Sequence, residues 1–445
     1  LFFAGKDFAP ATRVEGHQIQ DYLQEHYFSM IRTVVNRMQD LDCVIGYDVF
    51  NEPQKGFIGH SDLRIENKAL RLGPTPTPWQ AILLGAGIPQ QISTWSLSLP
   101  GFPLHRKVLM NPNGIRVWLP GRACVWQENG VWDFDAKGEP RLIHPDYFAR
   151  IKDHDVEFSQ DYLVPFTRQF AETVHAIDSD ALIFMENEVD DPAPRWLEAP
   201  QHQIVYAPHW YDGFVLFTKR FIPWLGTNVR SRRLVLGKRM IHRSYAKQMG
   251  LFKREAREKL GGVPVLIGEI GIPFDLEQKI GYHSGNFSIH ALAMDRSMKA
   301  LEKNLLNTTI WNYTSDNDNV HGDQWNDEDL SIFSPDQRNR PEDINSGGRG
   351  LAAVVRPYPI ATAGIPQYLN FNFLTGHFEY GFKTTTETKA PTRFFIPHLH
   401  YPHGITVQLS DGAYQYDEKN QLLEYTPGNL DLHIISIKPI RKTLL

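Results

Sequence analysis

The stretch Cys43-Val44-Ile45-Gly46-Tyr47-Asp48-Val49-Phe50 is a short apolar run, and Asn51-Glu52-Pro53 follows it directly. A run of this length, rich in β-branched and aromatic residues, predicts a buried strand. In (β/α) barrels the catalytic groups stand at the carboxyl tips of parallel strands, which is where Glu52 would lie. Taken alone, the tripeptide is equally typical of a strand-ending turn with a solvated glutamate.

A second stretch far downstream has the same form. Residues 263–271, Val-Pro-Val-Leu-Ile-Gly-Glu-Ile-Gly, predict another strand that ends in a glutamate, Glu269. Two glutamates at strand tips are what a retaining glycosidase requires, one as acid/base and one as nucleophile. The pair therefore favours a catalytic interpretation of Glu52.

The composition is that of a globular protein with a large core. The chain has 445 residues, 42% hydrophobic and 22% charged, which suits one barrel and a smaller domain. A net charge of −5 argues against a nucleic-acid binder. The two cysteines, Cys43 and Cys124, are too few for a disulfide framework and favour a reducing compartment, and Cys43 is expected to be a small core residue. No apolar run approaches the ~20 residues of a membrane span. The expected location is cytoplasmic or vacuolar, with membrane association as an option.

Helices and strands alternate along most of the chain. From residue 55 to 145 this alternation stops among frequent Pro and Gly, which predicts a long insertion on the catalytic face. From about residue 384 short alternating strands predict an antiparallel sandwich, with a boundary at 375–390 and domains of 1–380 and 381–445. Helices are predicted at 17–40, 160–177, 244–260 and 288–305, and strands at 43–50, 181–185, 204–211, 263–271 and 308–313.

These five strands are fewer than the eight of a closed (β/α)₈ TIM barrel. If Glu52 ends the fourth strand, strands one to three precede Leu1 and are missing from the sequence. A second chain or a longer parent polypeptide is expected to supply this N-terminal barrel segment. Residues 1–445 alone are then expected to give no cooperative, active enzyme.

Four further side chains at strand ends suit the chemistry of two glutamates. Asn51 can bind a sugar 2-hydroxyl, and Trp311 offers a flat face on which a sugar ring can stack. Tyr211 or His209 can donate a hydrogen bond to Glu269 and favour its ionised form. The alternatives are a core tryptophan and a satisfied polar pair.

Two other carboxylates, Glu186 and Glu188, follow the predicted strand at 181–185. They are rivals for a catalytic role because they also occupy a strand tip. We rank them lower because nothing around them matches a catalytic arrangement, and a substrate-binding role stays open.

An ordered set of four motifs carries a resemblance to a known family. Asn51-Glu52-Pro53, His209-Trp210-Tyr211, Gly268-Glu269 and Trp311 together resemble glycoside hydrolase family five. The resemblance implies a (β/α)₈ barrel with Glu52 as acid/base after strand four and Glu269 as nucleophile after strand seven. It also implies that Asn51 and Trp311 contact the glycone, with His209 and Tyr211 beside the nucleophile. The family's sugar-binding residues from strands one and three have no counterpart here.

A narrower likeness rests on residues 311–319, 322–329 and 356–359, which resemble the endoglycoceramidase-related group and especially its fungal glucosylceramidases and steryl β-glucosidases. The likeness covers nearly the whole chain, least so at residues 60–140. It implies a retaining β-glucosidase acting on steryl glucoside or glucosylceramide. We expect no cofactor, because no His/Cys cluster shows metal-ligand spacing. The alternatives are an exo-β-glucanase or cellulase-like enzyme and a non-catalytic carbohydrate-binding barrel.

Residues 213–254 contain no Asp or Glu but many Lys, Arg and aromatic residues. A basic, aromatic segment of this kind can dock on an anionic bilayer as a peripheral contact. In the alternative interpretation its bases pair with acids elsewhere, such as those of residues 316–329.

Overall fold

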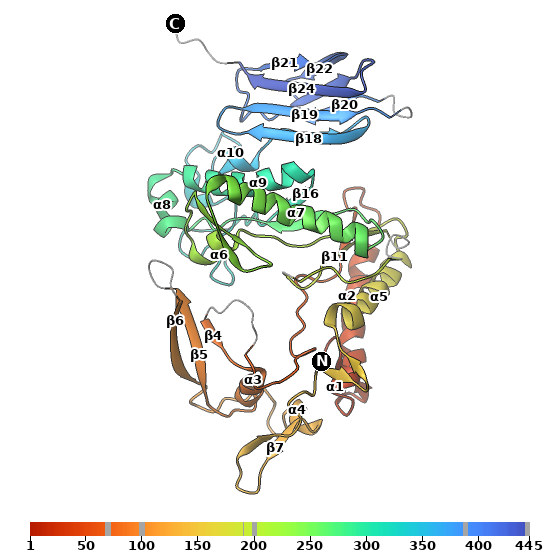
Figure 1. Ribbon diagram of the computed structural model, residues 1–445, viewed down its shortest axis with the longest axis vertical. Coiled ribbons are helices and arrows are strands. Elements are labelled where there is room, and N and C mark those ends of the chain that lie inside the picture. Colours follow the sequence, from red (N-terminus) through yellow and green to blue (C-terminus); the bar gives the residue numbers. More distant parts are fainter. Residues whose placement is uncertain (67–72, 98–102, 190, 198–202, 386–389, 441–445) are drawn as a thin grey trace. The chain divides into compact units, whose positions relative to one another are not determined.

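The computed structural model describes residues 1–66, 73–97, 103–189, 191–197, 203–385 and 390–440 (Figure 1). The chain forms two compact units. The N-terminal unit consists of Leu1–Tyr206 and Arg257–Val263, and the C-terminal unit of Ala207–Ala256 and Pro264–Leu445.

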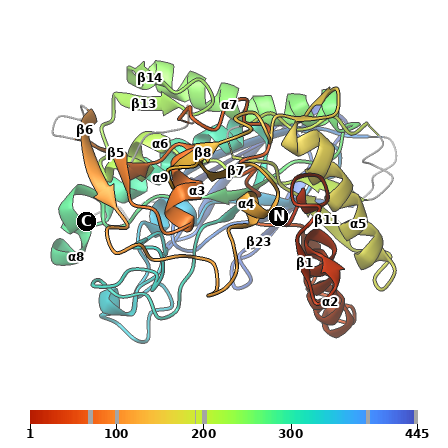
Figure 2. The same ribbon diagram turned by 90° about the horizontal axis from the view of Figure 1, so that it is seen from below.

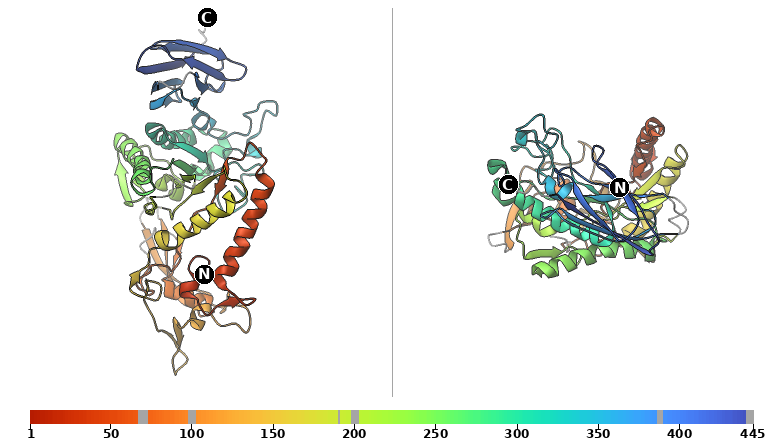
Figure 3. Two further views of the ribbon diagram at one scale, coloured as in Figure 1. Left: turned by 90° about the vertical axis from the view of Figure 1, so that its right-hand side faces the viewer. Right: turned by 90° about the horizontal axis from the view of Figure 1, so that it is seen from above.

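The N-terminal unit contains a three-stranded parallel sheet in the order β12-β11-β3. Ile183 of the central strand pairs with Tyr47 on one side and Ile204 on the other. Helices α2 and α5 lie side by side (Figure 3, left), and each buries an apolar stripe repeating every three or four residues. The elements of the core are α2 (Ile19–Met38), β3 (Gly46–Asp48), η1 (Ser159–Leu163), α5 (Val164–His175), β11 (Leu182–Met185) and β12 (Ile204–Tyr206).

The first strand is shorter than the sequence predicts. Pairing starts at Gly46, which faces Leu182 of β11, and a Cβ at Gly46 would come within 2.1 Å of the Leu182 carbonyl oxygen. Cys43 precedes the strand in a turn and is exposed, so the expectation that it is a core residue is wrong. Because Gly46 has no side chain, the two backbones can approach this closely where the pairing begins.

The predicted insertion at 55–145 has secondary structure of its own. Helix α3 begins with a capping box, in which the Thr77 hydroxyl accepts from the Gln80 N–H and the Gln80 side chain accepts from the Thr77 N–H. The insertion also contains a three-stranded antiparallel sheet in the order β4-β5-β6 and a hairpin β7-β8. The remaining elements of the unit are α1 (Gly5–Phe8), β1 (Arg13–Val14), β2 (His17–Gln18), β4 (Gly73–Thr75), α3 (Pro78–Gly85), β5 (Gln90–Leu97), β6 (Pro103–Met110), α4 (Val125–Glu128), β7 (Trp132–Phe134), β8 (Pro140–Leu142), β9 (Arg150–Ile151) and β10 (His154–Asp155).

The C-terminal unit contains two helix–strand pairs. Helix α7 leads into β15 and helix α9 into β16, and the two strands pair in parallel. Within the described residues the five parallel strands lie at the predicted positions but form two open sheets, not a closed barrel. No helix of the described part is long and apolar enough to cross a membrane. The elements are α6 (Gly213–Thr218), β13 (Leu225–Asn228), β14 (Arg233–Leu236), α7 (Lys238–Lys259), β15 (Leu266–Ile270), α8 (Leu276–Ser284), α9 (Ser288–Asn304), β16 (Asn307–Ile310), η3 (Pro335–Gln337) and α10 (Leu351–Val354).

An antiparallel β-sandwich completes this unit, as the sequence predicts (Figure 1). Its two four-stranded sheets have the orders β17-β20-β23-β22 and β18-β19-β24-β21, and their inner faces enclose an aromatic core that includes Phe378, Phe394 and Tyr425. The strands are β17 (Tyr358–Ala361), β18 (Ile365–Asn372), β19 (His377–Lys383), β20 (Thr392–Phe395), β21 (Ile405–Leu409), β22 (Ala413–Asp417), β23 (Leu422–Thr426) and β24 (Leu432–Pro439).

The sandwich begins earlier than the predicted boundary at 375–390. Its first two strands, β17 and β18, precede that boundary, and β18 is paired with β19 along its whole length. Both strands contain proline, Pro359 and Pro366, and both lie at the edge of a sheet. Proline is tolerated at sheet edges, so these residues, which favour a loop by sequence, do not interrupt the sandwich.

Candidate active site

Glu269 stands on β15, and the segment after β12 runs alongside it. The Trp210 N–H donates to the Glu269 carbonyl at 3.0 Å, and the Gly268 N–H donates to the Pro208 carbonyl at 3.0 Å. A Cβ at Gly268 would lie 3.1 Å from the His209 ring, so glycine at this position lets the two segments approach. These backbone contacts place His209 and Glu269 directly opposite each other, as a parallel bridge.

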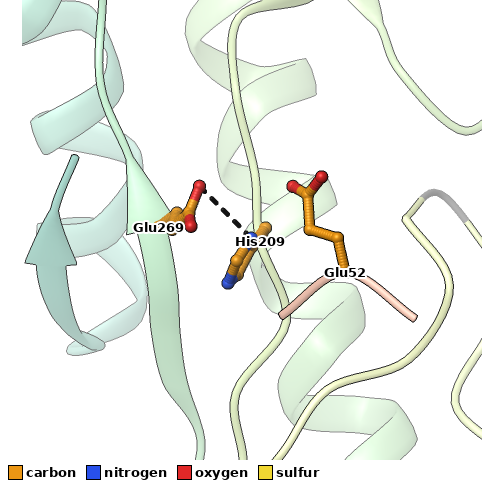
Figure 4. Close-up of side chains that lie close together, drawn as sticks. All are labelled: Glu52, His209 and Glu269. Carbon is orange, nitrogen blue, oxygen red and sulfur yellow. Dashed lines mark ion pairs between the residues drawn. The ribbon is translucent and has the colours of Figure 1, made fainter. Parts of the chain in front are cut away.

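The Glu269 carboxylate has two side-chain partners, as the sequence predicts. The Tyr211 hydroxyl donates to Oε2 at 2.7 Å, and His209 Nδ1 lies 3.3 Å from the same oxygen (Figure 4). Both carboxylate and imidazole are largely buried, with 12% and 3% of the side chain exposed. The buried, low-dielectric setting strengthens the hydrogen bond from Tyr211. Tyr211 and His209 thus orient the Glu269 carboxyl group.

Trp311 directly follows β16 and joins the end of β15. Its N–H donates to the Ile270 carbonyl at 3.0 Å. A Cβ at Gly271 would come within 2.1 Å of the Trp311 carbonyl oxygen, so this contact also depends on a glycine. The half-buried Trp311 therefore belongs to the same strand ends as Glu269, and its predicted contact with a sugar stays a prediction.

A buried polar network fixes the loop after Trp311. Asp323 accepts from the side chains of Asn312 and Asn317 at 3.0 and 2.8 Å, and Asn317 also donates to Asp329 at 2.9 Å. Asp329 is in turn bound by the fully buried Arg349 through two hydrogen bonds of 2.6 and 3.2 Å. In the sequence, Asn312, Asn317, Asp323 and Asp329 stand out only as part of a resemblance, and Arg349 lies outside the segments that carry it. Their role in the structure is to hold the loop in one conformation.

Glu52 belongs to the N-terminal unit, where its backbone is unusual. Its φ is 44°, in the left-handed region that costs a non-glycine residue about 1–2 kcal/mol. The Glu52 N–H donates to Glu186 Oε2 at 2.8 Å, and Glu186 is buried. Strained backbone held by a buried partner is common at functional sites. Asn51 is exposed, and its predicted contact with a sugar stays a prediction.

The rival carboxylates Glu186 and Glu188 have structural partners. Glu188 Oε2 lies 2.9 Å from Lys55 Nζ, and Asp191 is 3.6 Å from the same ammonium group. Burial raises the pKa of Glu188, Lys55 opposes that rise, and Asp191 adds to it. Together with the contact between Glu186 and the Glu52 backbone, this arrangement indicates that both residues support the strand tip.

The chain is similar in sequence to known glycoside hydrolases. Residues 356–438 match the model of the glycoside hydrolase family 5 C-terminal domain. A glucosylceramidase of Rhizopus delemar is 33% identical over 95% of this chain and 66% of its own length. The ergosteryl-beta-glucosidase of Saccharomyces cerevisiae is 28% identical over 98% of this chain and 70% of its own length. The chain thus spans about two thirds of the length of these curated relatives.

Solved structures of the same kind share the fold. The crystal structure of Cryptococcus neoformans sterylglucosidase 1 matches 98% of this chain and 70% of its own with a TM-score of 0.91 and 28% identity. Endo-glycoceramidase II from Rhodococcus sp. matches 98% of this chain and 68% of its own with a TM-score of 0.52 and 16% identity. The described α/β fold with a C-terminal antiparallel sandwich is therefore the fold of these enzymes.

Proposed function

Because the chain belongs to glycoside hydrolase family five, we propose that it forms the catalytic part of a retaining β-glucosidase that hydrolyses glucosylated lipids. The observation that carries the proposal is the Glu269 carboxylate, oriented by Tyr211 and His209 at the end of a parallel strand. The names of the relatives indicate the substrate class, glucosylceramide or ergosteryl β-glucoside.

In the proposed reaction Glu269 and Glu52 have different tasks. A Glu269 oxygen attacks the anomeric carbon while the Glu52 carboxylic acid gives its proton to the departing lipid oxygen, so that a glucosyl–Glu269 ester and a free lipid alcohol form. Glu52, now a carboxylate, then takes a proton from water, and the hydroxide releases β-glucose from Glu269. The meeting of Glu52 with Glu269 in one site is part of this proposal.

An apolar pocket beside Glu52 supports a bulky lipid leaving group. The proton donor must lie next to the leaving oxygen, so the aglycone binds on its side. In the N-terminal unit Glu52 borders a pocket of ≈ 430 Å³ whose other walls are mostly aromatic, among them Phe2, Phe3, Phe50, Phe57, Trp126 and Phe148. Such a wall suits a sterol or ceramide better than a second sugar. The choice between the two lipids can be made by comparing the hydrolysis of both glucosides.

The two roles can be separated with azide in the full-length protein. With an activated aryl β-glucoside, Glu52→Ala is expected to accumulate the glucosyl-enzyme, and added azide should restore turnover and give the β-glucosyl azide. Glu269→Ala is expected to be inactive, and azide should then give the α-glucosyl azide by direct displacement. The opposite pairing of variants and products would contradict the assignment of the two roles. If azide rescued neither variant, the assignment would be abandoned.

Two other functions make different predictions. An exo-β-glucanase would hydrolyse glucan oligosaccharides faster than a glucosylated lipid. A non-catalytic carbohydrate-binding barrel would bind glycolipid equally well with and without Glu269→Gln. The unchanged protein would then show no turnover. The oriented carboxylate of Glu269 argues against the second, because a binding protein has no need of a nucleophile.

A further inference from the structure

The hairpin β13-β14 and the residues just before it present an apolar and basic surface. Trp224, Leu234 and Leu236 are exposed to 58%, 65% and 62%. Arg220 and Arg233 are also exposed, and within the described part of the chain neither has a carboxylate at ion-pair distance. Monomeric proteins rarely leave apolar groups of this size together in water without a partner. We name these five residues the hairpin surface.

The packing of the hairpin explains why these leucines face outward. Gly226 and Val235 are paired, and a Cβ at Gly226 would come within 2.5 Å of the Tyr245 hydroxyl of α7. Side chains alternate along a strand, so Leu234 and Leu236 point away from α7. Figure 2 shows the hairpin lying along this helix. The exposure of the leucines thus follows from a well-packed hairpin.

Neighbouring acids do not neutralise the surface. Asp275 binds Lys219, and Glu255 holds Arg230 through two hydrogen bonds. Two further acids that approach from adjoining segments are also engaged: Asp212 pairs with the buried Arg296, and Glu277 accepts from the Phe221 N–H.

Within the described part of the chain, no acid of residues 316–329 forms a salt bridge with a base of residues 213–254, so the alternative interpretation lacks its partners. Asp323 and Asp329 belong to the buried network after Trp311, and Asp318 binds His321. The positive charge of the hairpin surface, which extends to Lys238 and Arg239, is therefore directed to solvent.

The side chain of Gln248 connects the hairpin to the candidate active site. Gln248 of α7 accepts from the Val229 N–H of the hairpin at 3.0 Å and from Trp210 Nε1 at 3.3 Å. Trp210 stands between His209 and Tyr211, the partners of Glu269. The segment that contains the hairpin also connects strand β12 to helix α7, and such loops lie at the carboxyl ends of parallel strands. The hairpin surface and Glu269 therefore both lie toward the carboxyl ends of the strands.

We propose that the hairpin surface docks the protein on an anionic lipid bilayer, so that the catalytic face meets the membrane that holds its substrate. The proposal rests on the proposed function for the choice of substrate, and on charge and apolar exposure for the surface itself. Tryptophan and leucine enter the interface between headgroups and chains, while arginines bind anionic headgroups. Each basic residue near such a membrane contributes about fivefold to the partition coefficient.

The test uses the full-length protein and two vesicle types, phosphatidylcholine alone and phosphatidylcholine with phosphatidylserine. The apolar variant is Leu234→Asn with Leu236→Asn, and the charge variant is Arg220→Glu with Arg233→Glu. We expect the protein to bind the phosphatidylserine vesicles more tightly, less so at high salt, and each variant to lose at least about tenfold of that binding. The control, Leu374→Asn with Lys419→Glu, changes one exposed leucine and one exposed lysine in the sandwich and should bind normally.

Hydrolysis separates this proposal from the proposed function. Both variants should hydrolyse a water-soluble aryl β-glucoside as fast as the unchanged protein, and a vesicle-embedded steryl glucoside more slowly, in proportion to lost binding. Equal vesicle binding by all proteins, or no binding by the unchanged one, overturns the docking surface. Normal docking without hydrolysis of any glucoside would instead contradict the proposed function.

Discussion

Replacing Tyr211 with phenylalanine removes one hydroxyl that donates to the Glu269 carboxylate at 2.7 Å. The ring and its packing are kept, so the change isolates the hydrogen bond. Bonds to charged groups contribute about 1.5–3 kcal/mol, and the short distance and the 12% exposure of Glu269 place this one in the upper half of that range. If the bond is present in the transition state, kcat/KM is expected to fall by about 45- to 160-fold.

The assay is steady-state hydrolysis of a soluble aryl β-glucoside by the full-length protein, beside a thermal unfolding curve. Tyr401→Phe is the matched control, because Tyr401 also donates one buried hydrogen bond, to the Gly376 carbonyl at 2.9 Å, but in the sandwich. The control should lose stability and keep kcat/KM. A Tyr211→Phe variant within twofold of the unchanged protein would refute the view that Tyr211 orients the nucleophile.

Three further changes test the supports of the site. Glu186→Leu removes the acceptor of the Glu52 N–H, so kcat/KM should fall about tenfold or more. Glu188→Gln should have a smaller effect on kcat/KM, and equal effects of the two changes would contradict the positioning role of Glu186. Asp329→Leu leaves Arg349 buried without its carboxylate and should lower the free energy of unfolding by about 3–5 kcal/mol, measured by urea unfolding. Adding Arg349→Met to this variant should regain part of the lost stability. Burial lowers the pKa of His290 to about 4, so the folded protein keeps this imidazole neutral while the unfolded chain protonates it near 6.5. Stability should therefore fall as the pH drops from about 6.5 toward 4, by about 2 kcal/mol at pH 5, and His290→Gln should show a smaller drop in unfolding titrations.

The residues around Glu269 could be predicted because strand tips are local signals. An apolar run that ends in a glycine and a charged residue is visible in the sequence, and His209 and Tyr211 end the preceding strand. Neighbouring parallel strands end at one edge, so their tips meet. The contacts of His209 and Tyr211 with Glu269 confirm that inference. The predicted pairing of Glu52 with Glu269 depends on how two units are placed and stays a prediction.

Other features could not be predicted because they depend on distant partners. The left-handed backbone of Glu52 is held by Glu186, a residue 134 positions away. The early start of the sandwich was hidden because edge strands tolerate Pro359 and Pro366, which favour a loop when considered singly. In both cases the local signal is opposed by a tertiary contact, and sequence patterns report only the local part.

The loop after Trp311 shows why a resemblance to glycolipid hydrolases does not identify the lipid. The residues that carry the narrower likeness, Asn312, Asn317, Asp323 and Asp329, bind one another and Arg349 in the structure. They are therefore required by the loop conformation, whichever aglycone leaves. Sterol and ceramide differ in rigidity and width, so discrimination between them must come from walls that touch the aglycone. Under the proposed function the aromatic pocket beside Glu52 is such a wall, and exchanges of Phe57 or Trp126 should alter the ratio of the two activities more than any change in the loop.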